Sequence, residues 1–91
     1  MIRSFRDADT AKVFREEFSK RFQSVASVAL RKLIHINQAR TLSDLKLPGN
    51  HLEALSGDRK GQYCIRINGR YRVCFKWGDL DADDVEIVDY H

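Results

Sequence analysis

The chain has 91 residues, of which 43% are hydrophobic and 32% are charged, and it carries a formal net charge of +3. This length supports one hydrophobic core, so we expect a single domain over residues 1–91. No apolar run approaches the roughly 20 residues that a bilayer requires, and Met1–Arg6 lacks the apolar core of a signal peptide, which predicts a cytoplasmic protein without a membrane partner. The charge permits a nucleic-acid partner but does not demand one.

The N-terminal part is predicted to hold a short strand and a helix. Residues Met1–Phe5 alternate apolar and polar side chains as an edge strand does, and Asp7 or Asp9 is a suitable N-cap for a helix. Three phenylalanines follow at four-residue spacing: Phe14, Phe18 and Phe22. Because this spacing puts side chains on one helical face, we expect the three rings to form one buried stripe.

A second helix is predicted over residues 24–40, because five apolar residues recur on one broad arc: Ala26, Ala29, Leu30, Leu33 and Ile36. The segment Thr41–Leu45 is typical of one capped turn, and Pro48-Gly49-Asn50 of a loop that changes the chain direction. Beyond this loop the period of the apolar pattern falls from about 3.6 residues to 2, which indicates that strands follow.

Two strands with one apolar and one basic face are predicted next. The apolar face consists of alternate residues, namely Tyr63, Ile65 and Ile67 in the first strand and Tyr71, Val73, Phe75 and Trp77 in the second. The Asn68-Gly69 pair indicates a hairpin, but a strict two-residue turn would put apolar and basic residues on the same face. We therefore expect a three-residue loop or a bulge at Gly69, which lines Arg66, Arg72 and Lys76 along the other face.

The last strand is predicted over Val85–Tyr90, after an acidic, turn-like segment at residues 78–84. The resulting element order is β-α-α-β-β-β. It predicts an α+β domain in which two N-terminal helices pack on one face of a mainly antiparallel sheet. The opposite face of the sheet is then available for a ligand.

The end of the sequence carries an acid, a phenol and an imidazole, in Asp89, Tyr90 and His91. Cleavage of RNA by its own 2′-hydroxyl needs a base, an acid and a cation near the phosphate, and these side chains together with the basic strand face are candidates for all three. On spacing alone, a frayed strand end and a solvated sheet face are the more ordinary interpretations. Cys64 and Cys74 have no metal-ligand spacing and are assigned no chemistry, and no motif indicates a metal or a cofactor.

Several segments resemble the HigB family of toxins, the plasmid maintenance killer proteins, within the RelE/ParE superfamily. The similarity covers nearly the whole chain and is carried by Met1–Arg6, Leu47–Leu55, Gly57–Tyr63 through Arg72, and Val85–His91. It implies a RelE/ParE-like fold and a toxin of a type II toxin-antitoxin system, an mRNA interferase that enters the ribosomal A site and cuts mRNA without a metal or cofactor. It also implies a HigA-type antitoxin with a helix-turn-helix fold, through which alone operator DNA would be bound.

The same resemblance assigns roles to individual residues. Residues 89–91 match the terminal catalytic residues of the family, and Arg72 matches an arginine that supports the phosphate. The family type best known for catalysis has a histidine and, three positions later, a lysine, where this chain has Glu53 and Ser56. Glu53 is therefore a candidate base, and we expect weaker cleavage than in members with the full set. The cations expected to contact RNA are Arg59, Lys60, Arg66, Arg70 and Lys76.

Two other functions stay open. The missing histidine and lysine favour a ribosome-binding growth inhibitor that needs little cleavage. A ParE-like inhibitor of DNA gyrase is the other alternative, although such an inhibitor needs a binding surface and has no need of a terminal proton-transfer set.

Overall fold

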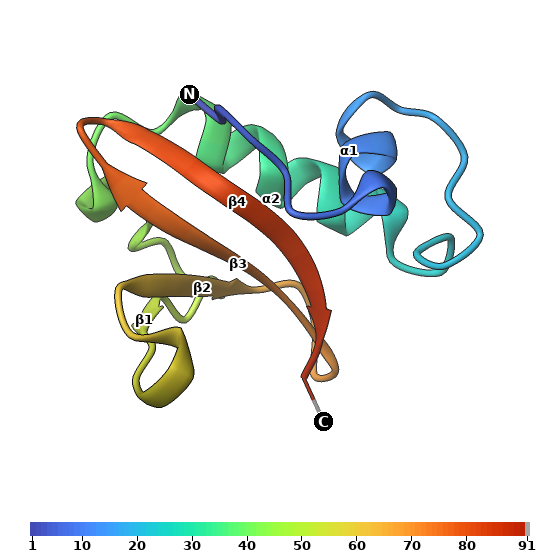
Figure 1. The fold of residues 1–91 in the computed structure, drawn as a ribbon. Coiled ribbons are helices and arrows are strands. Elements are labelled where there is room, and N and C mark those ends of the chain that lie inside the picture. Colours follow the sequence, from blue (N-terminus) through green and yellow to red (C-terminus); the bar gives the residue numbers. More distant parts are fainter. Residues whose placement is uncertain (91) are drawn as a thin grey trace.

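The structure is a computed structural model that describes residues 1–90, and His91 lies outside the described residues. Two helices lead into short 3₁₀ turns and four strands. These elements are α1 (Ala8–Phe14), α2 (Ala26–Gln38), η1 (Leu42–Leu45), β1 (Glu53–Ala54), η2 (Gly57–Arg59), β2 (Gln62–Arg66), β3 (Tyr71–Gly78) and β4 (Asp81–Asp89). The strands pair antiparallel in the order β1-β2-β3-β4, and both helices cover the same side of the sheet (Figure 1). The predicted α+β class is confirmed.

The core lies between the helices and the two long strands β3 and β4. Its fully buried side chains come from both layers, with Ala29, Leu33 and Ile36 on α2 and Val73, Phe75, Val85 and Ile87 on the strands. The apolar arc of α2 thus packs on the alternate apolar residues of the sheet, as their periods predict. The helices therefore cover one face of the sheet, and its other face is available for a ligand.

The first helix is shorter than predicted, and the expected phenylalanine stripe is wrong. Asp7 caps the helix as expected, because its carboxylate accepts a backbone N–H at 2.6 Å. However, α1 ends at Phe14, and the chain turns away at Glu16 with a φ of +61°. Phe22 is then 1% exposed, whereas Phe18 is 72% exposed.

Side-chain hydrogen bonds from Ser19 explain why the helix does not continue. Its hydroxyl donates to Asp9 at 3.0 Å and accepts the backbone N–H of Phe22 at 3.3 Å. Such bonds offer the backbone an alternative to helix formation. They turn the chain so that only one of the two later rings enters the core.

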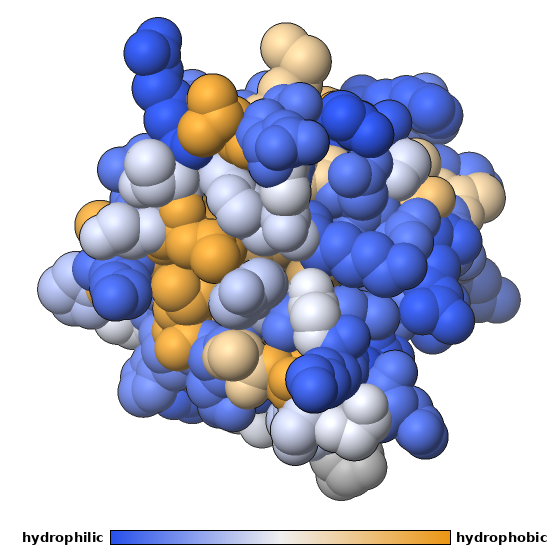
Figure 2. All heavy atoms as spheres, turned by 60° about the vertical axis from the view of Figure 1, so that its left-hand side comes forward, coloured by the Kyte–Doolittle hydropathy of each residue, from blue (hydrophilic) through white to orange (hydrophobic). Residues whose placement is uncertain are grey.

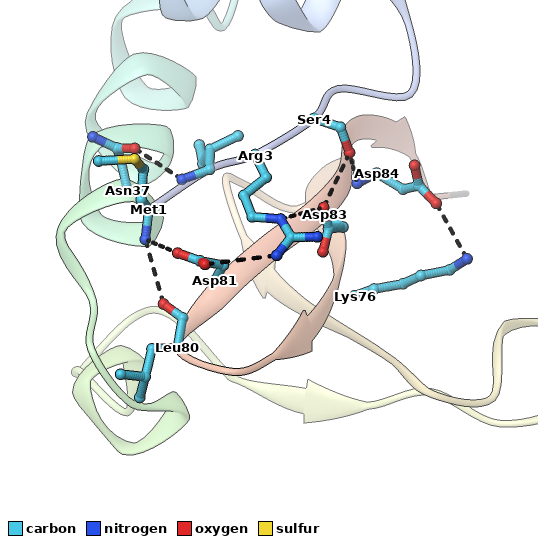
Figure 3. Close-up of polar contacts among 10 residues, drawn as sticks. Met1, Arg3, Ser4, Asn37, Lys76, Leu80, Asp81, Asp83 and Asp84 are labelled. Carbon is cyan, nitrogen blue, oxygen red and sulfur yellow. Dashed lines mark hydrogen bonds and ion pairs between the residues drawn. The ribbon is translucent and has the colours of Figure 1, made fainter.

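The N-terminal segment lies beside the start of β4 and is not a full strand. Single parallel bridges join Ile2 to Ala82 and Phe5 to Val85. Polar contacts strengthen this docking (Figure 3): the Met1 amino group lies 3.2 Å from Asp81, and other ion pairs join Arg3 to Asp81 and Asp83. The acidic segment predicted as a turn is therefore largely strand, and two of its carboxylates, Asp81 and Asp83, pair with the N-terminal segment.

Both hairpins have turns that their sequences explain. In the first, Ile67 N–H donates to the Tyr71 carbonyl at 3.0 Å, which leaves the predicted three-residue loop. In the second, the pairing of Gly78 with Asp81 leaves two residues, Asp79 and Leu80, with φ of +49° and +73°. Positive φ at both positions is the mark of a type I′ turn, whose twist suits a tight hairpin. Strand β4 therefore begins at Asp81 and not at the predicted Val85.

The surface is mostly hydrophilic. Figure 2, which brings the left-hand side of Figure 1 forward, shows an apolar patch surrounded by polar atoms. Among the large apolar side chains, Met1, Phe18 and Leu80 are the most exposed. Within residues 1–90, neither helix has the length and the apolar run that a bilayer-crossing helix needs.

Candidate active site on the basic face of the sheet

The sheet face opposite the helices carries a row of four side chains across the strands. The register sets Glu53 opposite Cys64, Cys64 opposite Cys74, and Cys74 opposite Glu86. Both cysteine side chains are fully buried. The centre of this face is therefore closed, and the part accessible to a ligand lies beside the row, where Arg72 stands.

Arg72 is held by three different groups. One guanidinium nitrogen, Nη1, lies 3.5 Å from the Glu53 carboxylate and 4.0 Å from the Cys64 Sγ. The guanidinium carbon also lies 4.9 Å from the centre of the Tyr90 ring, a cation–π contact. With 21% of its side chain exposed, Arg72 is oriented but still reachable by a phosphate. The structure thus brings together three of the predicted catalytic residues, Glu53, Arg72 and Tyr90.

Glu53 reaches this site through a loop fixed by a buried asparagine. Asn50 is fully buried, donates to the Leu45 carbonyl at 3.0 Å and accepts from the Lys32 ammonium. Its own carbonyl accepts the Arg66 N–H at 2.6 Å, which ties the loop to β2. The carboxylate that this loop presents is 51% exposed. Glu53 can therefore exchange a proton with solvent or with a bound substrate.

Asp89 lies apart from this group. It is the register partner of Tyr71, on the helix-facing side of the sheet, whereas Tyr90 contacts Arg72 on the other side. The Arg70 guanidinium binds the Asp89 carboxylate with two nitrogens, at 2.7 and 3.0 Å. The hydrogen bond and charge of this carboxylate raise the pKa of Arg70. The fifth predicted catalytic residue, His91, falls outside the described residues.

The five predicted RNA-binding cations differ in how much of their charge is available. Three are in ion pairs: Arg59 with Glu86, Arg70 with Asp89, and Lys76 with Asp84. The other two, Lys60 and Arg66, take part in none of the ion pairs of residues 1–90. Of these two, Arg66 is the register partner of Arg72 and is therefore the cation best placed to contact a phosphate backbone near it.

Sequence reasoning missed a second charged cluster next to the cysteine row. Glu86 is 13% exposed and pairs with both Arg6 and Arg59, each at 3.1 Å. Burial acts to lower the pKa of Arg59, but the Glu86 hydrogen bond and charge outweigh it and raise that pKa. The alternation of Glu86 with the apolar residues Val85 and Ile87 indicates that Glu86 lies on the polar face of its strand. No sequence pattern, however, predicts its ion pair with Arg6.

Within the part of the chain that the structure describes, no three His, Cys, Asp or Glu side chains converge as metal ligands. The candidate site itself offers an oriented guanidinium, an exposed carboxylate and a phenol ring. A guanidinium suits the charge of a phosphate, a carboxylate can accept a proton, and an aromatic ring can stack on a base.

Comparison with known proteins gives consistent matches. Residues 3–91 match the family described as HigB-like toxin, a RelE-like toxin of type II toxin-antitoxin system HigB. Toxin HigB-1 of Vibrio cholerae is 42% identical over 57 residues, which cover 62% of this chain and 60% of that toxin. An uncharacterized protein of Haemophilus influenzae is 29% identical over 84 residues, covering 79% and 83% of the two chains.

Among solved structures, a chain of the YoeB-YefM complex from Staphylococcus aureus aligns over 100% of this chain and 98% of its own length. The TM-score is 0.57 at 15% sequence identity. A likeness at this identity concerns the fold alone.

Proposed function

The chain belongs to the HigB-like toxin family, the RelE-like toxins of type II toxin-antitoxin systems, and we propose that it is a ribosome-dependent endoribonuclease that cleaves mRNA without a metal ion. The observation that carries this proposal is the contact of Arg72 with both Glu53 and Tyr90 on an accessible sheet face. The guanidinium suits a phosphate, the carboxylate suits the proton of a 2′-hydroxyl, and the ring suits a nucleobase.

The proposed roles follow from the chemistry of each side chain. Arg72 stabilises the charge that develops on the phosphate, because its guanidinium is already oriented. Glu53 takes the 2′-hydroxyl proton, and His91 supplies the proton for the leaving oxygen. Tyr90 stacks on a base beside the scissile bond. Asp89 acts indirectly, since it anchors the strand end to Arg70.

Replacement of His91 by glutamine is expected to lower mRNA cleavage by about 10²–10⁴-fold, which is the usual contribution of one general acid or base. The thermal midpoint should stay unchanged, because glutamine keeps the polarity and approximate size of histidine. Cleavage on ribosomes programmed with a defined mRNA measures the effect, with Lys20→Gln as a control, because Lys20 is exposed in the segment after α1 and belongs to no predicted site. Full cleavage by a folded His91→Gln variant would remove His91 from the mechanism.

A growth inhibitor that binds the ribosome and needs little cleavage is the second candidate. The ion pair between Arg72 and Glu53 favours it, because this pair offsets part of the positive charge that a phosphate would meet. Growth after expression of His91→Gln separates the two functions. Growth inhibition that survives the loss of cleavage points to the second candidate, and restored growth points to the nuclease.

The proposed partners are the ribosomal A site with its mRNA and a HigA-type antitoxin with a helix-turn-helix fold. Operator DNA is then bound only through the antitoxin, and the complex works in the cytoplasm. Family membership supports an antitoxin partner, as does the structural neighbour, which comes from a complex of YoeB with YefM. The net charge of +3 favours partners that present negative charge. Lys60 and Arg66 favour them too, because these two cations take part in none of the ion pairs of residues 1–90.

Association with this antitoxin is expected to slow as the salt concentration rises. Exposed cations attract an acidic partner segment over long range, and salt screens this attraction. Stopped-flow or surface-based association rates between low and high ionic strength give the measurement. A rate that does not change with salt would exclude electrostatic steering.

A further inference from the structure

Two buried thiols face one another across the hairpin beneath the candidate active site. Cys64 on β2 and Cys74 on β3 are register partners, and both are fully buried. Both cysteines are free thiols. The nine residues between them in the sequence match no metal-ligand spacing, but the strand register places the two side chains next to each other on one face of the sheet.

The hydrogen-bond pattern shows which kind of cross-strand pair they form. Ile67 N–H points to β3, where it donates to Tyr71, whereas Arg66 N–H points away and donates to Asn50. Since this direction alternates along a strand, the N–H of Cys64 also points away from β3. Cys64 and Cys74 therefore form a non-hydrogen-bonded pair, with Cα atoms about 4.5 Å apart. That separation lies at the short end of the roughly 4.4–6.8 Å that disulfides span.

The surroundings of the two sulfurs are unequal. Arg72 Nη1 lies 4.0 Å from the Cys64 sulfur, while Cys74 is the register partner of the acidic Glu86. A hydrogen bond from the Cys74 thiol lowers the pKa of Cys64, and the Arg72 charge acts in the same direction. The same hydrogen bond, together with burial, raises the pKa of Cys74. One thiol is thus set to react as a thiolate and the other to remain protonated, the division of labour found in reactive dithiols.

We propose that Cys64 and Cys74 form an oxidation site, which hydrogen peroxide converts into a cross-strand disulfide. The Cys64 thiolate attacks one peroxide oxygen and breaks the O–O bond, which gives a sulfenic acid and, after proton uptake, one molecule of water. The Cys74 sulfur then attacks the sulfenic sulfur and loses its proton, and the hydroxyl leaves as a second water. Two thiols are oxidised and one peroxide is reduced.

Access to the buried sulfurs comes from the active-site side. The Glu53–Arg72 ion pair lies next to Cys64, and its carboxylate is half exposed. Glu53 belongs to β1, which is only two residues long, so this edge of the sheet can open locally at low cost. A small peroxide can therefore reach Cys64 without unfolding of the sheet. This site does not depend on RNA cleavage.

The test uses the folded full chain and hydrogen peroxide. After treatment, the chain is denatured, its free thiols are alkylated, and the intact mass is measured. The expected result is a chain that has lost two hydrogen atoms, takes up no alkylating agent and recovers both thiols after reduction. Peptide mapping without reductant should show Cys64 joined to Cys74. Thiols that remain alkylatable, disulfide-linked dimers, or sulfonic acids without a disulfide would each overturn the proposal.

Two single variants test the assignment of the reactive thiol. Cys74→Ser should trap a sulfenic acid at Cys64, detected by its adduct with dimedone. Cys64→Ser, the matched control, should react more slowly, because Cys74 lies opposite the acidic Glu86, whereas Cys64 lies beside the Arg72 guanidinium. Equal rates would overturn the assignment of Cys64. If either serine variant fails to fold, brief treatment of folded wild type with peroxide and dimedone decides: an adduct on Cys64 supports the assignment, and an adduct on Cys74 overturns it.

Discussion

Replacement of Arg72 by alanine is expected to lower mRNA cleavage by about 10²–10³-fold, the usual effect of removing one oriented group that stabilises transition-state charge. The free energy of unfolding should fall by only about 1 kcal/mol, because Arg72 is part of a surface ion pair and one cation–π contact. Single-turnover cleavage on programmed ribosomes and thermal denaturation, measured on the same preparations, give the two quantities. Cleavage must therefore fall far more than stability does.

Two further variants separate charge, geometry and binding. Arg72→Lys keeps the charge but loses the planar guanidinium, so its cleavage should lie between wild type and Arg72→Ala. Arg66→Ala is the matched control, because Arg66 is the register partner of Arg72 on the same face and takes part in none of the ion pairs of residues 1–90. It should weaken RNA binding with little effect on the cleavage step. Equal losses of cleavage in Arg66→Ala and Arg72→Ala would make Arg72 one binding cation among several.

The features that sequence analysis predicted well depend on short-range spacing. The apolar arc of Ala29, Leu33 and Ile36 repeats with the helical period, and the helix forms where the arc lies. The three-residue hairpin loop followed from the need to keep apolar residues of both strands on one face, and the structure has that loop. In each case the residues that determine the structure lie within one helix or one hairpin.

The features that it missed depend on strand register or on contacts between distant segments. Strand β1 has two residues, too few for an alternation to be visible, yet its pairing brings Glu53 to Arg72. Arg6 and Glu86 meet because the N-terminal segment docks on β4, which no local pattern indicates. The opposition of Cys64 and Cys74 likewise needs the register of the first hairpin. The candidate site is therefore mainly a product of the sheet pairing.

The spacing of the phenylalanines did not predict which of their rings are buried. A four-residue spacing is necessary for a helical stripe, but it does not establish one, because side-chain hydrogen bonds can end the helix first. The predicted stripe buries both Phe18 and Phe22, but in the structure only one of the two rings is buried. Phe22 is buried, with its ring 6.2 Å from that of Tyr71 at 89°, whereas Phe18 lies in solvent.

Replacement of Phe22 by alanine is therefore expected to lower the free energy of unfolding by about 3–5 kcal/mol, the usual cost of emptying a buried aromatic site. Phe18→Ala, the matched control, should change it by no more than about 0.5 kcal/mol. Because small domains are stable by only about 5–15 kcal/mol, the first variant loses much of its stability and the second almost none. Urea titrations followed by circular dichroism measure both values. Similar losses in the two variants would mean that Phe18 is buried as well, and that the helix continues beyond Phe14 as the spacing alone suggested.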